Sequence, residues 1–284
     1  MPAVICAGLI TVDAVYDLEA FPEEGSKVRA RTARLQPGGG ALLAATTVSK
    51  LGGTARLAGA IGDDLFGQFL RGQMALRGID DTLVQTLKGE TTAHSAVFVT
   101  ADGERTIVNQ RSDRLLEIEL MADLPDYDAV LVDTRCQNLV RRLFQQAQRE
   151  GKPSVLDGEA PVPRDLLPLV SHLALSEQGL ADFEGTSLAE IAAQNQFWVC
   201  VTRGAEDVEL HDGSRFTPPR VTPLDTLGAG DVWHGAFAFA LAKGLNEPEA
   251  VEFSNAAAAL FVSRTGDARF PTSREVEDVL QTQR

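Results

Sequence analysis

Residues 225–231 read Asp-Thr-Leu-Gly-Ala-Gly-Asp and run directly into an apolar stretch, 232–241, that has the character of a long helix. Small residues at a helix start let backbone N–H groups converge on an anion, and the helix dipole adds a favourable positive potential. Asp231 would lie in the first turn, where a carboxylate can take the proton of a hydroxyl that attacks a phosphoryl group. A bare Gly-Ala-Gly-Asp is more often a turn with a capping aspartate, so its surroundings must decide.

Most of the chain alternates short apolar segments with helical patterns. Strand-like segments bounded by turn residues occur at 4–9, 129–133, 154–157, 173–176 and 198–202. Helices are expected at 41–51 and from residue 65, the second with Asp63 and Asp64 as N-terminal caps. This alternation predicts an α/β fold with a mostly parallel central sheet and helices on both faces. Because the sequence shows no linker and no internal repeat, we expect one domain over residues 1–284.

Two segments break the alternation. Residues 27–34 alternate basic and small side chains, and residues 94–109 fit a β-hairpin around Asp102-Gly103. Both suit a small antiparallel sheet outside the main core. We therefore expect a β lid whose strands are inserted at about 12–36 and 92–112.

Charge and composition exclude several classes of function. The net charge of −14 opposes binding to a nucleic-acid backbone or an anionic membrane surface. The three cysteines are widely spaced in apolar segments, which favours reduced core thiols, and the four histidines show no metal-ligand spacing. There is no apolar run long enough to span a bilayer and no signal-peptide pattern at the start, so a cytoplasmic protein without a built-in metal is expected.

The string 225–231 with its following helix resembles the C-terminal signature of the ribokinase-like (PfkB) carbohydrate kinases. The resemblance implies that Gly228, Ala229 and Gly230 form the anion hole and that Asp231 is the catalytic base. It further implies ATP and Mg²⁺ as cofactors, and K⁺ as a monovalent cation near Asp225.

Other segments match the same family in the same order, from residue 8 to residue 259. They are Gly8 with Asp13, Gly38-Gly39-Gly40, 61–67, 201–204 and 254–259. The resemblance assigns Asp13 and the glycines to the sugar, and Thr202, Gly204 and Asn255 to the nucleotide. Consecutive glycines allow close approach of a ligand, and a carboxylate at a strand end can take two hydroxyls, although a turn and a loop cap are the alternatives. Small residues around Asn255 could equally mean close helix packing.

The chain departs from the family pattern at three places. Residues 41–43 are Ala-Leu-Leu, where ribokinases carry an asparagine that holds sugar hydroxyls. Residues 176–179 read Ser-Glu-Gln-Gly in place of Asn-x-x-Glu, so Glu177 is the candidate for organising magnesium. Asp207 replaces a glycine after Thr202.

Basic residues near the predicted lid and strand ends suggest an anionic sugar. If 27–34 is a strand, Lys27, Arg29 and Arg31 point to one face; a solvated or dimer-facing edge is the alternative. Arg135 follows an apolar strand and offers a planar fork to an anion, or forms a salt bridge with Asp133 or Glu159.

Together with Asn109, Lys27 and Arg135 are similar to the residues that hold the sulfonate in the sulfofructose kinase branch. The expected reaction is therefore ATP-dependent phosphorylation of 6-deoxy-6-sulfofructose on O1. A ribokinase, a fructose-phosphate kinase or a 2-keto-3-deoxygluconate kinase is the alternative within the class. An inactive sugar- and nucleotide-binding regulator is the alternative outside it. The resemblance also implies a homodimer formed through the lid.

Overall fold

The computed structural model describes residues 1–120 and 123–283 and contains a large sheet with the strand order β13-β12-β11-β10-β9-β8-β1-β4-β5. The pairs from β5 to β11 are parallel, whereas β12 and β13 extend the sheet in antiparallel pairing. The strands are β1 Ala3–Ala7, β4 Thr54–Gly62, β5 Asp80–Leu87, β8 Ala129–Val132, β9 Ser154–Gly158, β10 His172–Ser176, β11 Trp198–Thr202, β12 Val208–Leu210 and β13 Arg215–Phe216. The predicted mostly parallel α/β sheet is confirmed.

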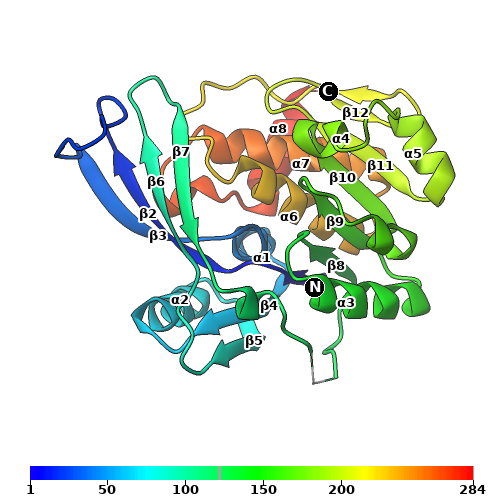
Figure 1. Ribbon diagram of the computed structural model, residues 1–284. Helices are drawn as coiled ribbons and strands as arrows, with labels where there is room; N and C mark the ends of the chain where they lie inside the picture. The colour runs from blue at the N-terminus through cyan, green and yellow to red at the C-terminus, as the bar shows by residue number, and fades with distance from the viewer. Residues whose placement is uncertain (121–122, 284) are drawn as a thin grey trace.

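Helices cover both faces of this sheet (Figure 1). The helices are α1 Gly40–Lys50, α2 Leu65–Leu76, α3 Gln137–Glu150, α4 Glu177–Ala181, α5 Leu188–Asn195, α6 Ala229–Ala242, α7 Glu247–Val262 and α8 Ser273–Gln283, with 3-10 turns η1 Asp113–Leu115, η2 Arg164–Leu169 and η3 Gly266–Arg269. Alternate residues of β1 show the two layers: Val4 and Cys6 pack with α1, α6 and α7, whereas Ile5 and Ala7 pack with α3 and α5. This is the burial expected of a central parallel strand.

Helix starts follow the sequence signals closely. Asp64 caps α2, its carboxylate accepting a hydrogen bond from the Gly67 N–H at 2.8 Å, whereas Asp63 instead accepts from Gly89 N–H at 2.9 Å. α6 is apolar around most of its circumference, and its residues from Val232 to Leu241 are all buried. A helix of that kind belongs inside the core, and its start is therefore held rigidly.

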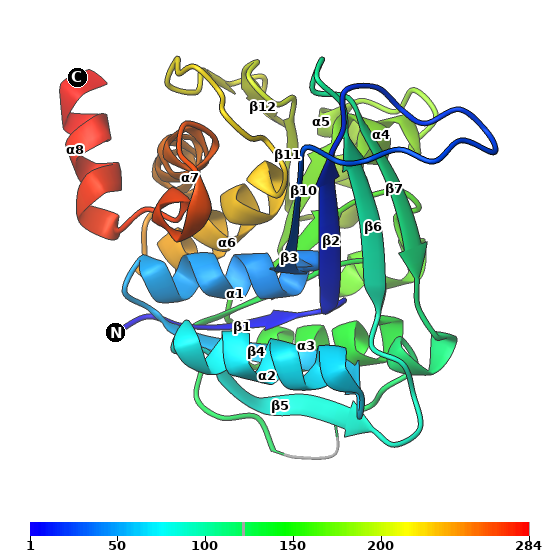
Figure 2. The same cartoon turned by 90° about the vertical axis from the view of Figure 1, so that its left-hand side faces the viewer.

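The lid is a second sheet with the order β3-β2-β6-β7. Its strands are β2 Thr11–Asp17, β3 Thr32–Gly38, β6 His94–Val99 and β7 Arg105–Gln110. The strands rise steeply from the main sheet (Figure 2), with β2–β3 and β6–β7 antiparallel and β2–β6 parallel. The hairpin turn lies at the predicted place, where Gly103 N–H donates to Thr100 O at 2.9 Å.

The interpretation of residues 27–34 as a strand is wrong for its first part. β3 begins at Thr32, which pairs with Asp17, the last residue of β2, so the preceding residues have no neighbouring strand. Residues 27–31 instead belong to an exposed loop that joins β2 to β3 and extends away from the sheet (Figure 2). Lys27, Arg29 and Arg31 therefore do not share the face of a strand.

The three cysteines, Cys6, Cys136 and Cys200, are buried and form no disulfide, as expected. Burial raises the pKa of each thiol. Among the described residues, no helix combines the length and the apolar character that crossing a bilayer requires.

Candidate active site

Acidic side chains gather where the central parallel strands end. Asp133 directly follows β8, and Asp157 is the fourth residue of β9. The Asp133 carboxylate accepts hydrogen bonds from the N–H groups of Leu9 (2.7 Å) and Arg135 (2.9 Å), so its position is fixed from two sides. Both carboxyl groups are almost fully buried, with 8% of each residue exposed. Open α/β sheets bind ligands at this edge.

Asp231 reaches the same edge from the first turn of α6. Gly228 precedes that helix with φ 83°, a left-handed conformation that glycine adopts without strain. A Cβ on Gly40 would lie 2.8 Å from Asp231 Oδ1 and 3.8 Å from Asp157 Oδ2. The starts of α1 and α6 therefore face each other across Asp231, and the predicted base and glycine segments are brought together.

The surroundings of Asp231 suit a base that works near neutrality. Burial, together with the carboxylates of Glu159, Asp133 and Asp13, raises the pKa of Asp231 to about 7, while Arg135 acts in the opposite direction. Burial also raises the pKa of Asp157, and again its acidic neighbours add to the effect. A general base is most effective when its pKa lies near the working pH.

His234 lies one helical turn after Asp231 on α6. Its Nδ1 is 3.4 Å from Asp157 Oδ2, and burial lowers the pKa of the imidazole to about 4. The ring is therefore neutral near pH 7 and does not compensate the negative charge of the carboxylates around it.

The lid supplies a row of polar side chains facing this edge. Cross-strand pairing places Gln36, Asp13, Ser95 and Asn109 next to one another across β3, β2, β6 and β7. Asn109 Nδ2 donates to Ser95 Oγ at 3.1 Å. A Cβ on Gly38 would collide with the Asp13 carboxylate, so glycine is required there. Asp13, Asn109 and the glycine segment thus lie together, as the sequence predicted.

Arg135 forms an ion pair with Glu159, which was the alternative left open from the sequence. The Arg135 side chain as a whole keeps 31% of its surface exposed. Lys27, by contrast, lies on the exposed β2–β3 loop, away from the carboxylate cluster. The structure therefore does not bring Lys27 and Arg135 together as a joint anion site.

A cavity of 1020 Å³ adjoins the other side of the anion-hole segment. Its walls include Thr202, Gly204, Ala229, Gly230 and Asn255. Loops after β11 and residues 217–223 close it on one side, with α6 and α7 on the other. The cavity has the size of a site for a nucleotide-sized ligand.

Individual side chains contribute unequally to this cavity. Asn255 is buried, with its amide committed to Trp233 Nε1 (2.8 Å) and to Phe216 O (3.1 Å), so it shapes the wall. Glu177 is largely exposed at the start of α4 and lies 3.6 Å from the Arg203 guanidinium. Another hollow, of 830 Å³, surrounds His172 at the opposite ends of the strands and contains none of the predicted site residues.

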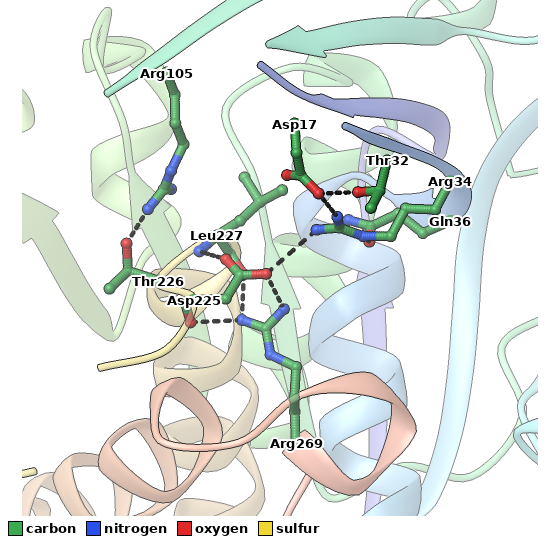
Figure 3. A network of polar contacts seen from close by, with 9 residues as sticks. All are labelled: Asp17, Thr32, Arg34, Gln36, Arg105, Asp225, Thr226, Leu227 and Arg269. Atoms are coloured by element: carbon green, nitrogen blue, oxygen red, sulfur yellow. Dashed lines mark hydrogen bonds and ion pairs between the residues drawn. The ribbon is translucent and has the colours of Figure 1, made fainter. Parts of the chain in front are cut away.

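Three arginines converge on the loop that leads into the anion hole (Figure 3). Arg269, at the end of η3, donates to Asp225 Oδ2 (2.9 Å), Asp225 O (2.8 Å) and Leu227 O (3.0 Å). Arg34 on β3 lies 3.5 Å from Asp225 Oδ2, and Arg105 on β7 donates to Thr226 Oγ1. The lid thus contacts the phosphate-loop candidate directly.

Sequence reasoning missed several of these side chains. Asp157 ends an apolar strand next to Asp133, so its position was a usable signal. Arg269 lies 44 residues after Asp225 in a short 3-10 turn and carries no recognisable pattern. The contact of Arg105 with Thr226 likewise depends on how the hairpin packs against the main sheet, which the sequence does not show.

The comparisons with known proteins agree with this geometry. Residues 1–273 match the pfkB family of carbohydrate kinases, and the chain belongs to that family. The ribokinase of Bacillus subtilis is 26% identical over 290 residues, covering 97% of this chain and 99% of its own. A solved structure from Agrobacterium tumefaciens, provisionally named a ribokinase, is 31% identical to this chain and has a TM-score of 0.93. The match covers 100% of this chain and 99% of that one.

A further structure is a ribokinase from Arabidopsis thaliana complexed with ribose and ATP. It has a TM-score of 0.80 at 23% identity and covers 99% of each chain, a level that supports the common fold. The protein is accordingly an ATP-dependent sugar kinase of the ribokinase-like fold. The comparisons do not show membership of the sulfofructose kinase branch, and the relatives found include several ribokinases.

Proposed function

We propose that this kinase transfers the γ-phosphoryl group of ATP to a hydroxyl of a small neutral sugar of the ribose class. The observation that carries the proposal is Asp231, a carboxylate with its pKa near 7, at the helix start that adjoins both the lid row and the 1020 Å³ cavity. A base at that position can deprotonate an attacking hydroxyl, and positioning with electrostatic stabilisation supplies the rest of the catalysis.

The remaining residues have roles that follow from their places. The sugar would lie between Asp13 and Asn109 of the lid and the glycines 38–40, whose missing side chains let hydroxyls approach the backbone. The transferring phosphoryl would sit on the N–H groups of the anion hole, residues 228–230, where the helix dipole favours negative charge. The rest of ATP would extend into the cavity beside Thr202 and Gly204.

Mg²⁺ would enter with the triphosphate, because it retains several waters and takes few protein ligands. Glu177 offers one carboxylate beside that cavity. When bound, the ion would neutralise charge that develops on the phosphoryl oxygens.

The charges around the base favour a neutral sugar over sulfofructose. Glu159, Asp133 and Asp13 all raise the pKa of Asp231, and Arg135 is the cation that acts against them. That cation is already paired with Glu159. A sulfonate placed there would add negative charge to a site with a surplus of it. The exposed part of the Arg135 side chain is what keeps 6-deoxy-6-sulfofructose as the second candidate.

A substrate panel with an ADP-release assay tests the choice. Ribose, fructose, fructose 6-phosphate, 2-keto-3-deoxygluconate and 6-deoxy-6-sulfofructose are compared by kcat/KM with Mg²⁺-ATP. We expect the highest value with ribose or another neutral sugar. Turnover with sulfofructose alone would replace this proposal by the second candidate. No ADP release with any sugar would favour a binding regulator.

The outer face of the lid supports a homodimer. Leu35 and Val108 occupy opposite ends of one cross-strand row, with 55% and 59% of their surfaces exposed. Exposed apolar side chains gathered on one sheet face are typical of an interaction surface. Light scattering should give the mass of a dimer for the natural chain and of a monomer for Leu35→Asp with Val108→Asp. A natural chain that is monomeric at all concentrations contradicts the interface.

A further inference from the structure

The guanidinium of Arg269 is bound to Asp225, the residue near which the family resemblance implies a free monovalent cation. Only 8% of the residue is exposed. Its two terminal nitrogens donate to one carboxylate oxygen and two carbonyl oxygens, all from Asp225 and Leu227, at 2.8–3.0 Å. Oxygen ligands of this kind, carboxylate and backbone carbonyl, are those that hard cations take in proteins. In this protein the Arg269 side chain occupies these oxygen atoms.

The guanidinium is also locked in place from its other side. It stacks on the ring of Phe261 in α7, with Cζ 3.8 Å from the ring centroid. Asp225 Oδ1, the oxygen that Arg269 leaves free, accepts from Leu227 N–H at 2.9 Å. The loop 225–227 is therefore wrapped around the guanidinium, immediately before Gly228 begins the anion hole.

The local charges disfavour an additional cation. Arg34 and Arg105 approach the same loop from the lid. Burial lowers the pKa of the Arg269 guanidinium, Asp225 raises it, and the charges of Arg34 and Arg105 add to the lowering. Two guanidinium groups, those of Arg34 and Arg269, thus meet at the Asp225 carboxylate, and a third, that of Arg105, contacts the adjacent Thr226 (Figure 3). A potassium ion would have to displace Arg269 from its oxygen atoms and would face the repulsion of the remaining arginines. The residues present do not fit a free cation.

We propose that Arg269 is a tethered cation that replaces the free monovalent cation, so that phosphoryl transfer by this kinase is independent of K⁺. Arg269 is a positioning residue: it holds the carbonyl groups of Asp225 and Leu227 and so sets the direction in which the N–H groups of residues 228–230 point. The inference rests on the proposed kinase function where it is tested by activity. Where it is tested by cation binding, it rests only on the contacts around Asp225.

The first experiment compares the natural chain in potassium chloride and choline chloride at equal ionic strength, with Mg²⁺-ATP supplied as a Tris salt. We expect kcat and Tm to be the same in both salts. An activator coupled to catalysis changes its partner's affinity or rate by about 5- to 150-fold, and a cation that binds the folded chain raises Tm with its concentration. A rise of about fivefold or more in kcat with K⁺, or a Tm that climbs specifically with K⁺, would overturn the inference.

The second experiment uses Arg269→Gln, with Arg264→Gln as the matched control. Arg264 lies in the same segment but pairs with Glu275 at 2.8 Å and does not contact Asp225. For Arg269→Gln we expect kcat in choline chloride to fall, and we expect K⁺ or free guanidinium to restore part of it. The control should keep its kcat and its indifference to K⁺.

The two experiments separate the failure of the inference from the failure of the proposed function. A chain without turnover on any sugar refutes the kinase proposal, yet the Tm comparison in the two salts still decides whether a free cation binds. If Arg269→Gln does not fold, the salt comparison on the natural chain decides the inference by itself. If Arg269→Gln keeps full kcat in choline chloride, Arg269 does not position the loop and the inference is wrong.

Discussion

The two sides of the phosphoryl-transfer site carry opposite charge. On the sugar side, Asp13, Asp133, Asp157 and Glu159 surround the base, and they are balanced by one arginine. On the loop side, Arg34 and Arg269 pair with Asp225, and Arg105 donates to the neighbouring Thr226. The acidic side raises the pKa of Asp231 towards neutrality, whereas we propose that the basic side attracts a triphosphate. Asp231 and residues 228–230, the proposed anion hole, lie between the two, so the proposed base and the proposed anion site share one helix start.

The largest effect should come from removing the base itself. Asp231→Asn keeps the size of the side chain but cannot accept the proton, so kcat should fall by about 10²- to 10⁴-fold. Nucleotide binding, measured by calorimetry, should change little because the cavity and the anion hole are untouched. A variant that retains a third of the natural kcat would contradict the assignment of Asp231 as the base.

The same variant should be more stable at alkaline pH. The folded-state pKa of Asp231, about 7, lies above its usual 3.8. The protonated carboxyl is therefore favoured by folding, and this contribution is lost as pH rises from 3.8 through 7. Asparagine is never ionised and avoids that loss, which is worth about 4 kcal/mol at pH 8 for a shift of this size. Denaturation at pH 5 and pH 8 should show a stability gain over the natural chain that shrinks at the lower pH.

A pair of variants should shift the pH profile in opposite directions. Because Asp231 must be ionised, kcat/KM should rise as pH passes through about 7. Glu159→Gln removes the carboxylate that raises this pKa most, so the acidic limb should move down by about 0.5–1 unit. Arg135→Gln removes the opposing cation and should move it up. Limbs that do not move, or that move together, would show that these charges do not act on the base.

Candidate site residues that lie close together in the sequence could be predicted. Contacts between residues that are far apart in the sequence could not. The segment 225–231 carries the proposed anion hole and the proposed base within seven residues, and the apolar runs 129–133 and 154–157 form strands whose ends lie at the edge of the candidate site. Their positions follow from backbone periodicity, because a strand buried on both faces admits few polar residues. Arg269, however, reaches Asp225 through a 3-10 turn whose location depends on how α7 and α8 pack.

The lid illustrates the same limit. Cross-strand pairing places the two substrate-binding candidates Asp13 and Asn109 in one row, but the alternation in residues 27–34 has no partner strand before Thr32. Alternating side chains form a strand only where a neighbouring strand supplies hydrogen bonds to the backbone. The roles of Asp13, Asn109, Thr202 and Gly204 stay predictions until they are tested, as does the cytoplasmic location.

The smallest effect on kcat/KM should come from replacing Lys27. Replacing Arg105 gives a matched comparison, because both are basic residues of the lid region. Lys27 lies on the exposed β2–β3 loop, and among the described residues it has no hydrogen bond or ion pair. A surface substitution of that kind changes free energies by at most about 0.5 kcal/mol, which is about twofold in kcat/KM. Lys27→Ala should therefore keep its kcat/KM for a neutral sugar.

Arg105 instead donates to Thr226 Oγ1 beside the anion hole. Arg105→Gln removes a charged donor from the lid's contact with that loop, and a hydrogen bond to or from a charged group is worth about 1.5–3 kcal/mol. Its kcat/KM should fall by about tenfold or more. The measurement compares both variants with ribose and with 6-deoxy-6-sulfofructose. If Lys27→Ala loses activity with the sulfonated sugar alone, the loop carries an anion-reading residue, and the sugar side of the site is not the purely acidic surface that its carboxylates suggest.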